Sequence, residues 1–183
     1  MKLKKSDYQI LEDKSVLRWK IFDVNKIKVK LPTGNVAEWA YVAGPDVVGG
    51  VVLTQKNTVI LKKEFRAAAK DLTLEIPAGS TEAKNEKERV KELNRELQEE
   101  IGLKGRKIEK LMSSFTNAHN SRAYHVYLVR DLKKSKLKQD EDELIETVEL
   151  PFSRALKEVL SGKQPTTYFT IAGLLLAKNR LGL

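Results

Sequence analysis

The spacing of the hydrophobic residues changes partway along the chain, and this change limits the folds that the sequence can adopt. From Val16 to about Ile76, apolar residues come in short runs, as is typical of β-strands. Turn sequences rich in Gly, Pro, Asn and Asp separate these runs, at 32–35, 44–46 and 55–57. The first part of the chain is therefore predicted to be rich in strands.

The spacing then becomes helical, because apolar residues recur at intervals of three and four at Val90, Leu93, Leu97 and Ile101. This stripe predicts a helix of roughly four turns that ends at Gly102. Further strands are expected around 113–115, 123–129 and 144–150, then a short helix that begins with Ser153 as its N-cap and a last helix over 167–180. Helices that interrupt mainly antiparallel strands indicate an α+β sandwich.

The composition excludes several classes of protein. The 183 residues include no cysteine, which excludes disulfide frameworks and cysteine nucleophiles. The longest apolar stretch, 171–177, is far shorter than the ~18 residues of a membrane span, so we expect a cytoplasmic protein without a membrane partner. The formal charge of +9 is spread along the chain, which favours a small-molecule substrate over nucleic acid.

The second half of the predicted helix is strongly acidic. Glu96, Glu99 and Glu100 stand at positions i, i+3 and i+4, so their carboxylates would converge on one helix face and repel each other. Either the side chains spread into water, as in many Glu-rich helices, or a divalent cation holds them. Hard oxygen ligands select Mg²⁺, Mn²⁺ or Ca²⁺, and Mg²⁺ usually also binds substrate phosphates.

The nine residues from Arg95 to Leu103, Arg-Glu-Leu-Gln-Glu-Glu-Ile-Gly-Leu, follow Pro77-Ala78-Gly79 at a distance. This pattern resembles the signature of the Nudix hydrolase family, which reads Gly, five residues, Glu, seven residues, then Arg-Glu-apolar-any-Glu-Glu-any-Gly-apolar. The second half of this signature matches the sequence from Arg95 to Leu103 at every specified position. Gly79 and Arg95 are sixteen positions apart instead of fourteen, so the early Glu has only two candidate counterparts, Glu86 and Glu88.

Other segments extend the resemblance over most of the chain. The sequence Glu64-Phe65-Arg66, followed by 74–79, is similar to the ADP-ribose and ADP-sugar pyrophosphatase branch, and the segments 140–146 and 170–177 also look like it. The resemblance implies Mg²⁺-dependent cleavage of the diphosphate in ADP-ribose or a related nucleoside diphosphate sugar, with Mn²⁺ as an alternative metal. The products would be a nucleoside monophosphate and a sugar phosphate.

The resemblance also implies roles for individual residues. Glu96, Glu99, Glu100 and the carbonyl of Ala78 would hold the metal, and Arg66 would meet a substrate phosphate. Arg95 would orient a carboxylate of the motif, while Gly79 and Gly102 would serve as turn and C-cap glycines. Glu143 would be the catalytic base, with Glu141 and Glu146 as alternatives, on a charged loop over 133–143 that would act as a lid.

Substrate selection is predicted from two tryptophans. Trp19 and Trp39 either fill a core or interface or, by resemblance to the animal ADP-sugar pyrophosphatases, stack on the nucleobase from two subunits of a homodimer, with Glu75 near the nucleoside. The loop 113–122 differs from the Ser-Pro-Gly segment of many members of the branch, so ADP-glucose and GDP-mannose remain alternative substrates. His119 in that loop could contact substrate, whereas His125 is expected to be packed or exposed instead of ligating.

The sequence thus predicts a Nudix fold, an α/β/α sandwich of the α+β class with a mixed sheet. Residues 1–45 would form an N-terminal antiparallel β region exchanged across a dimer, and residues 46–183 the hydrolase domain. Two rival functions stay open. One is hydrolysis of another nucleotide, such as a nucleoside triphosphate, a dinucleoside polyphosphate or capped RNA; the other is a catalytically silent nucleotide-binding module.

Overall fold

A computed structural model describes residues 3–139 and 143–183, and these form two compact units. The N-terminal unit contains the residues up to Pro45 together with Phe115–Ala123. The C-terminal unit contains Asp46–Ser114 and Tyr124–Leu183. Each unit is described by itself below.

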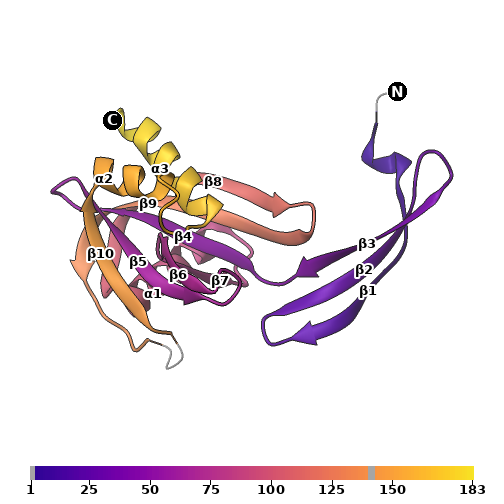
Figure 1. Ribbon diagram of the computed structural model, residues 1–183, viewed down its shortest axis with the longest axis horizontal. Helices are drawn as coiled ribbons and strands as arrows, with labels where there is room; N and C mark the ends of the chain where they lie inside the picture. The colour runs from indigo at the N-terminus through magenta and orange to yellow at the C-terminus, as the bar shows by residue number, and fades with distance from the viewer. Residues whose placement is uncertain (1–2, 140–142) are drawn as a thin grey trace. The chain divides into compact units, whose positions relative to one another are not determined.

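The N-terminal unit is a three-stranded antiparallel meander (Figure 1). After a short 3₁₀-helix, Lys5–Asp7, come β1 (Gln9–Trp19), β2 (Phe22–Lys30) and β3 (Val36–Ala43). The strand β2 includes the segment Lys26-Ile27-Lys28-Val29, in which basic and apolar residues alternate. Among the described residues of this unit, only Val29 is a buried hydrophobic side chain, so the meander has almost no core of its own.

The C-terminal unit contains a mixed sheet around β4 (Asp46–Leu53). This strand runs parallel to β9 (Asn120–Lys134) and antiparallel to β5 (Thr58–Arg66) and β7 (Ala78–Thr81). The strand β5 also pairs with β6 (Asp71–Glu75) and β10 (Ile145–Pro151), and β8 (Leu103–Asn117) pairs with β9. The prediction of a mixed sheet is confirmed.

Helices pack on both faces of this sheet. The helix α1 (Glu86–Glu100) buries Leu93 and Leu97 in one core cluster. The helices α2 (Phe152–Leu160) and α3 (Tyr168–Leu181) contribute to a second cluster. Both clusters include residues of β4 and β5, because alternate side chains of a strand point to opposite faces. The unit is therefore the predicted α/β/α sandwich, and within the described residues no helix is long and apolar enough to cross a membrane.

Two local predictions were wrong. The N-cap of α2 is Pro151, and Ser153 lies inside the first turn of the helix. Proline fixes the extended backbone that ends β10 and starts the helix two residues earlier than expected. The strands predicted around 113–115 and 123–129 are parts of the much longer β8 and β9, whose exposed residues hid their length from a search for apolar runs.

Candidate active site

The acidic residues occupy the C-terminal end of α1. The helix begins after Asn85, whose side chain accepts a hydrogen bond of 3.0 Å from the Glu88 amide, and it ends before Gly102, which has a φ of 69°. A helix C-terminus has partial negative charge. Three carboxylates in this last turn therefore oppose both each other and the helix dipole, so the site needs positive charge.

A buried lysine of β5 supplies part of that charge. Ile60, Lys62, Glu64 and Arg66 alternate along the strand and share the face toward α1. The Lys62 ammonium contacts the carboxylate of Glu100, lies 2.9 Å from Glu64 Oε2 and donates a 3.5 Å hydrogen bond to the carbonyl of Ala78. Burial opposes this charge, but the carboxylates of Glu100 and Glu64 raise the pKa of Lys62 above its ordinary value.

A second cation, Arg95, lies on the outer side of the helix. Its guanidinium pairs with Glu96, contacts Glu99 Oε2 at 2.5 Å and reaches Glu92 Oε2 at 3.0 Å. Against the opposing effect of burial, these carboxylates raise the pKa of Arg95 further above its already high value. The predicted role of Arg95 as a partner of motif carboxylates agrees with these contacts.

Gly79 lies beside the carboxylate of Glu96. A Cβ atom at this glycine would stand only 2.1–2.4 Å from the three carboxyl atoms of Glu96, so the carboxylate would have to move. Gly79 belongs to β7 and is absent from the glycines with positive φ. It was predicted as a turn glycine, but in the structure it leaves space for a side chain that passes close to the backbone.

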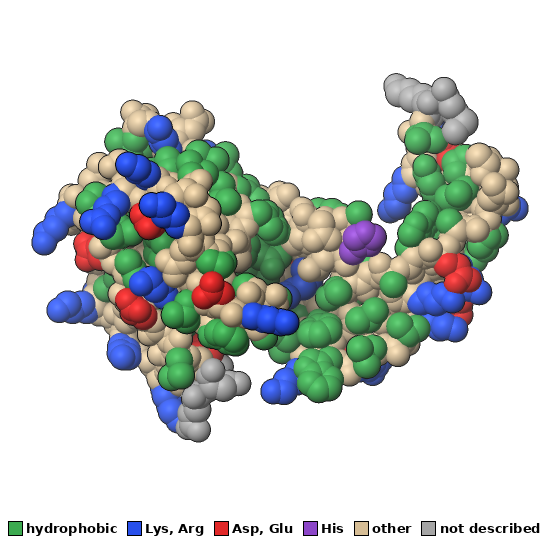
Figure 2. Space-filling view, viewed as in Figure 1, with side chains coloured by type: hydrophobic (Ala, Val, Ile, Leu, Met, Phe, Trp, Pro, Cys, Tyr) green, Lys and Arg blue, Asp and Glu red, His purple; other side chains and the backbone are tan. Residues whose placement is uncertain are grey.

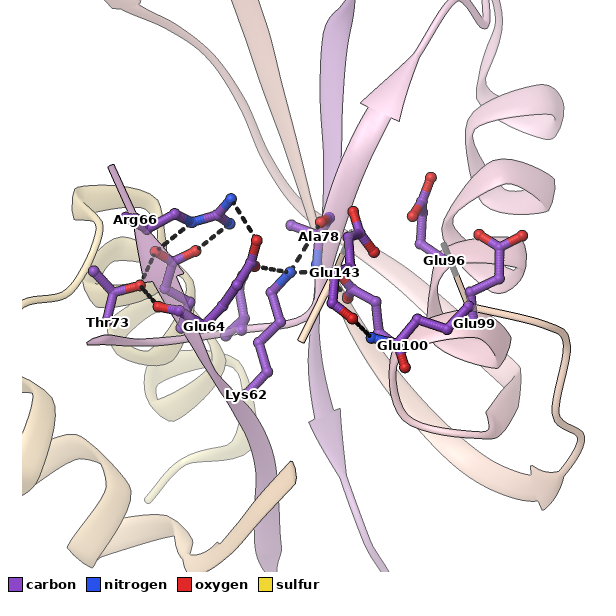
Figure 3. A network of polar contacts seen from close by, with 12 residues as sticks. Lys62, Glu64, Arg66, Thr73, Ala78, Glu96, Glu99, Glu100 and Glu143 are labelled. Carbon is purple, nitrogen blue, oxygen red and sulfur yellow. Dashed lines mark hydrogen bonds and ion pairs between the residues drawn. The ribbon is translucent and has the colours of Figure 1, made fainter. Parts of the chain in front are cut away.

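Burial, together with repulsion between carboxylates, raises the pKa values of two carboxyl groups in this cluster. Burial, followed by the negative charges of Glu99 and Glu143, raises the pKa of Glu96 to about 7 against the opposing effect of Arg95. Burial raises the pKa of Glu100 to about 7 even though Lys62 is in contact, and Glu96 and Glu143 add to the effect. Glu143, the predicted base, thus lies within electrostatic reach of the motif glutamates (Figure 3).

A second polar network lies on the same face of the sheet (Figure 3). Arg66 binds the completely buried Glu75 through two hydrogen bonds of 3.2 and 2.8 Å and donates a third, of 3.0 Å, to Glu64. Thr73 donates a 2.6 Å hydrogen bond to Glu75. Burial alone would raise the pKa of Glu75, but the bonds from Arg66 and Thr73 hold it below its ordinary value. Glu75 therefore fixes the orientation of the Arg66 guanidinium.

The donor set fits a divalent metal by its chemistry. Carboxylate oxygens and a backbone carbonyl are the ligands that Mg²⁺ and Mn²⁺ prefer, and Lys62 already places a cation at Glu100 and Ala78. Within residues 3–139 and 143–183, no three acidic or His side chains converge closely enough to enclose an ion. In this structure Arg95 pairs with Glu96 and Glu99, and Lys62 pairs with Glu100.

Several other predicted residues lie outside this cluster. Glu86 and Glu88 stand in the first turn of α1, where Glu86 pairs with Lys110 at 2.9 Å, so neither joins the motif glutamates at the other helix end. Glu146 lies on β10 and is 3.6 Å from Lys63. Glu141 is outside the described residues, as is part of the predicted lid.

The tryptophans and histidines are elsewhere in the fold. Trp19 and Trp39 belong to the N-terminal unit and are 60% and 48% exposed. His119 is exposed in the turn between β8 and β9. His125 is buried between Ser113 and Asp46, at 2.7 and 3.2 Å from its two ring nitrogens, so of the two expected alternatives, packed or exposed, the ring is packed.

A cavity of about 590 Å³ lies at the opposite end of β5, and no acidic residue lines it. Its walls include Asn57, Phe152 and Leu156. Because a strand rises about 3.3 Å per residue, Asn57 is roughly 16 Å along the chain from Lys62. The cavity is therefore separate from the acidic cluster.

Sequence reasoning missed Lys62 and Glu64 as site residues. A signal was present, because both follow the buried Ile60 at intervals of two residues and so continue its face of the strand. A charged side chain that continues the buried face of a strand indicates a paired charge. The partners of Lys62, however, come from α1 and β7, and only the tertiary fold brings these elements close to β5.

Comparisons with known proteins agree with this geometry. Residues 44–169 match the NUDIX domain. The ADP-ribose pyrophosphatase of Bacillus subtilis (strain 168) is 32% identical over 159 residues, or 82% of this chain and 85% of that protein. The methanol dehydrogenase activator of Bacillus methanolicus is 30% identical over the same shares of the two chains. A crystal structure of an ADP compounds hydrolase has the same fold, with a TM-score of 0.84 at 20% identity over 100% of this chain and 97% of that one.

Proposed function

The chain belongs to the Nudix hydrolase family, and on that premise we propose that it hydrolyses the diphosphate of ADP-ribose or of a related nucleoside diphosphate sugar. The products are a nucleoside monophosphate and a sugar phosphate. One observation supports a phosphate-bearing substrate: Arg66 of β5, held by Glu75 of β6, lies within electrostatic reach of Glu100 at the acidic end of α1. The Bacillus subtilis relative, an ADP-ribose pyrophosphatase, points to ADP-ribose.

The proposed cofactor is Mg²⁺, with Mn²⁺ as the alternative. Glu96, Glu99, Glu100 and the Ala78 carbonyl are the oxygen donors available to it. When bound, a divalent cation acidifies water and neutralises charge on the diphosphate oxygens. Burial and, after it, repulsion between carboxylates raise the pKa values of Glu96 and Glu100, and a cation at the helix end would offset both effects.

Arg66 is the proposed diphosphate ligand. Three of its five N–H donors are used by Glu75 and Glu64, which leaves two for a substrate oxygen. Its side chain is 39% exposed while Glu75 beneath it is completely buried. The buried carboxylate therefore holds the guanidinium in one orientation before the substrate arrives, which lowers the entropic cost of binding.

Glu143 is the proposed general base. It lies beside Glu96 and Glu100, where a carboxylate can accept the proton of the attacking water. Glu146 is less suitable because it is 67% exposed on β10 and pairs with Lys63. Of the two candidate bases that the structure describes, Glu143 and Glu146, only Glu143 lies near the acidic cluster.

Trp19 and Trp39 are proposed to stack on the nucleobase in a homodimer. Trp19 pairs with Phe22 and Trp39 with Ile27 on the same strand β2. Phe22 and Ile27 are five residues apart, so the two indoles project from opposite faces of the meander. One meander therefore cannot clamp a base between both indoles, which supports the prediction that two subunits contribute. The exposed apolar side chains of this unit (Figure 2) are consistent with a partner surface.

A substrate panel tests the proposal. We expect release of AMP from ADP-ribose with Mg²⁺ to exceed turnover of ADP-glucose, GDP-mannose, ATP and a dinucleoside polyphosphate. Glu143→Gln should lower kcat by about 100-fold or more, whereas the matched control Glu146→Gln should keep most of the rate. Preferential cleavage of ATP or the dinucleotide would establish the rival hydrolase. Absence of turnover with every substrate and metal would establish a binding module.

A further inference from the structure

The cavity at the far end of β5 has no part in the proposed hydrolysis. Its walls come from the turn between β4 and β5, the start of α2 and the end of α3. Phe152 and Leu156 belong to the core cluster beneath α2 and α3, whereas α1, with the acidic residues, packs in the cluster on the other face of the sheet. A volume of about 590 Å³ is typical of small-molecule sites. The cavity is therefore a second candidate site in the C-terminal unit.

The walls of this cavity are largely apolar. Phe152 and Leu156 are only 4% and 9% exposed, whereas Leu160, one helical turn further along α2, is 53% exposed. The cavity thus has a buried apolar floor and an apolar edge that is in contact with water. A ligand with an apolar body would remove that edge from water, which favours binding.

Three lysines from separate parts of the chain meet at the cavity. Lys56 comes from the turn between β4 and β5, Lys157 from α2 and Lys178 from the last turn of α3. Within residues 3–139 and 143–183, none of the three forms an ion pair with an acidic side chain. The positive excess remains when the terminal carboxylate of Leu183, which also lines the cavity, is counted. A cleft lined by charge of one sign attracts ions of the other sign.

The turn that carries Lys56 is held against α2. The Lys56 amide donates a 3.2 Å hydrogen bond to Thr54 Oγ1, and the Phe152 amide donates one of 3.1 Å to the Asn57 carbonyl. These bonds fix the turn relative to the start of the helix. Lys56 and Lys157 therefore border a cavity that is already formed, which lowers the cost of ordering the site when a ligand binds.

We propose that this cavity binds a small amphipathic anion, a molecule whose apolar chain or ring ends in one carboxylate, sulfonate or phosphate group. The apolar part covers the floor and edge on α2, and the anionic group lies among the three lysines. The site is distinct from the proposed hydrolytic site, so it binds its ligand whether or not the chain cleaves nucleotide sugars.

Isothermal titration calorimetry with decanoate, below its micelle concentration, tests the proposal on the full chain. Decanoate should bind at one site per chain, and octanoate roughly tenfold more weakly because it buries two fewer methylene groups. Acetate lacks the apolar part and decyltrimethylammonium has the opposite charge, so neither should show saturable binding. Equal binding of decanoate and decyltrimethylammonium would overturn the proposal, because the exposed apolar side chains of the meander would explain both.

Exposed residues of the cavity can be changed with little risk to the fold. Lys157→Glu and Leu160→Asp should each weaken decanoate binding at least tenfold. Their matched controls, Lys163→Glu after the end of α2 and Leu175→Asp on α3, lie outside the cavity and should change the affinity less than twofold. An unchanged affinity in either cavity variant, or an equal loss in its control, would overturn the proposal.

Vesicles of phosphatidylglycerol distinguish a free anion from an anionic membrane surface. The protein should not sediment with them, because the cavity takes up a single molecule and a lipid would have to leave the bilayer to enter it. Sedimentation that Lys157→Glu abolishes, together with no saturable binding of decanoate, would assign the lysines to membrane contact and overturn the proposal.

Discussion

Both units of this protein are built from β-strands, but they differ in how much of the apolar strand surface is buried. The C-terminal unit buries strand residues on both faces of its sheet, whereas the N-terminal unit leaves most apolar side chains of its strands exposed. Its exposed hydrophobic residues include Ile10, Val16, Leu17, Trp19, Ile21, Val36 and Trp39. A β-meander gains stability from burial, and without a core it needs another surface. The exposed apolar side chains of the N-terminal unit support the proposal that this unit contacts a second subunit.

The largest expected effect comes from truncating one leucine in each unit, buried in the C-terminal unit and exposed in the N-terminal unit. Leu97→Ala removes a completely buried side chain and should lower the free energy of unfolding by about 3 kcal/mol. Leu17→Ala removes one that is 53% exposed and should cost less than about 0.5 kcal/mol. Urea denaturation monitored by fluorescence measures both. Similar losses of free energy of unfolding in the two variants would show that the N-terminal unit has a core comparable to that of the C-terminal unit.

The next effect concerns the close contact at Gly79. In Gly79→Ala the new methyl group would push the Glu96 carboxylate away, so kcat should fall about 100-fold while the fold is largely kept. Gly173→Ala is the control, because its methyl group would crowd Val126 and Val51 in the core on the other face of the sheet. That variant should lose stability and retain kcat. If Gly79→Ala kept its kcat and Gly173→Ala lost it, Glu96 would not belong to the catalytic cluster.

A smaller effect is expected on assembly. Ile10→Asp places a charge on a side chain of β1 that is 63% exposed and should weaken a homodimer by at least tenfold, since burying an unpaired charge in an interface is costly. Light scattering after gel filtration measures the mass across a concentration series. Lys70→Asp, in the turn before β6 of the other unit, should leave the mass unchanged. A wild type that is monomeric at every concentration would refute the contact role of the meander.

The smallest effect is the pH dependence of the metal-free protein. The pKa of Glu96 is raised from 4.5 to about 7, so between these values the folded state binds more protons than the unfolded state. Stability should therefore fall as pH rises from about 5 to 7.5, with a loss of about 2 to 4 °C in Tm. Glu96→Gln should make this fall smaller in EDTA, with Glu100 accounting for the remainder, whereas Glu82→Gln, an exposed control, should leave the fall unchanged. A Tm that rises over this range would contradict the assignment.

Much of this architecture could be predicted from the sequence. The helical stripe with its motif predicted α1 and the order of its glutamates, and membership of the Nudix family is confirmed. The turn sequences correctly separated the first strands. These features depend on local spacing and residue type, which a sequence contains directly.

The missed features depend on contacts between distant elements. The Lys62–Glu100 pair joins residues 38 positions apart, and only the packing of α1 on β5 brings them together. Gly79 was assigned to a turn because a sequence shows flexibility but not the side chain that approaches from α1. The exposure of Trp19 and Trp39 likewise follows from a meander without a core, and composition does not reveal that.

The most direct test of the central claim is the Mg²⁺ dependence of ADP-ribose hydrolysis in the wild type and Glu99→Gln. The account predicts a wild-type rate that rises with Mg²⁺ to saturation and is absent in EDTA. It predicts a rate at least 100-fold lower in Glu99→Gln, with Glu92→Gln, on the same helix, close to the wild type. Hydrolysis that proceeds equally in EDTA, or equally in Glu99→Gln, would contradict the assignment of the α1 glutamates as the catalytic centre.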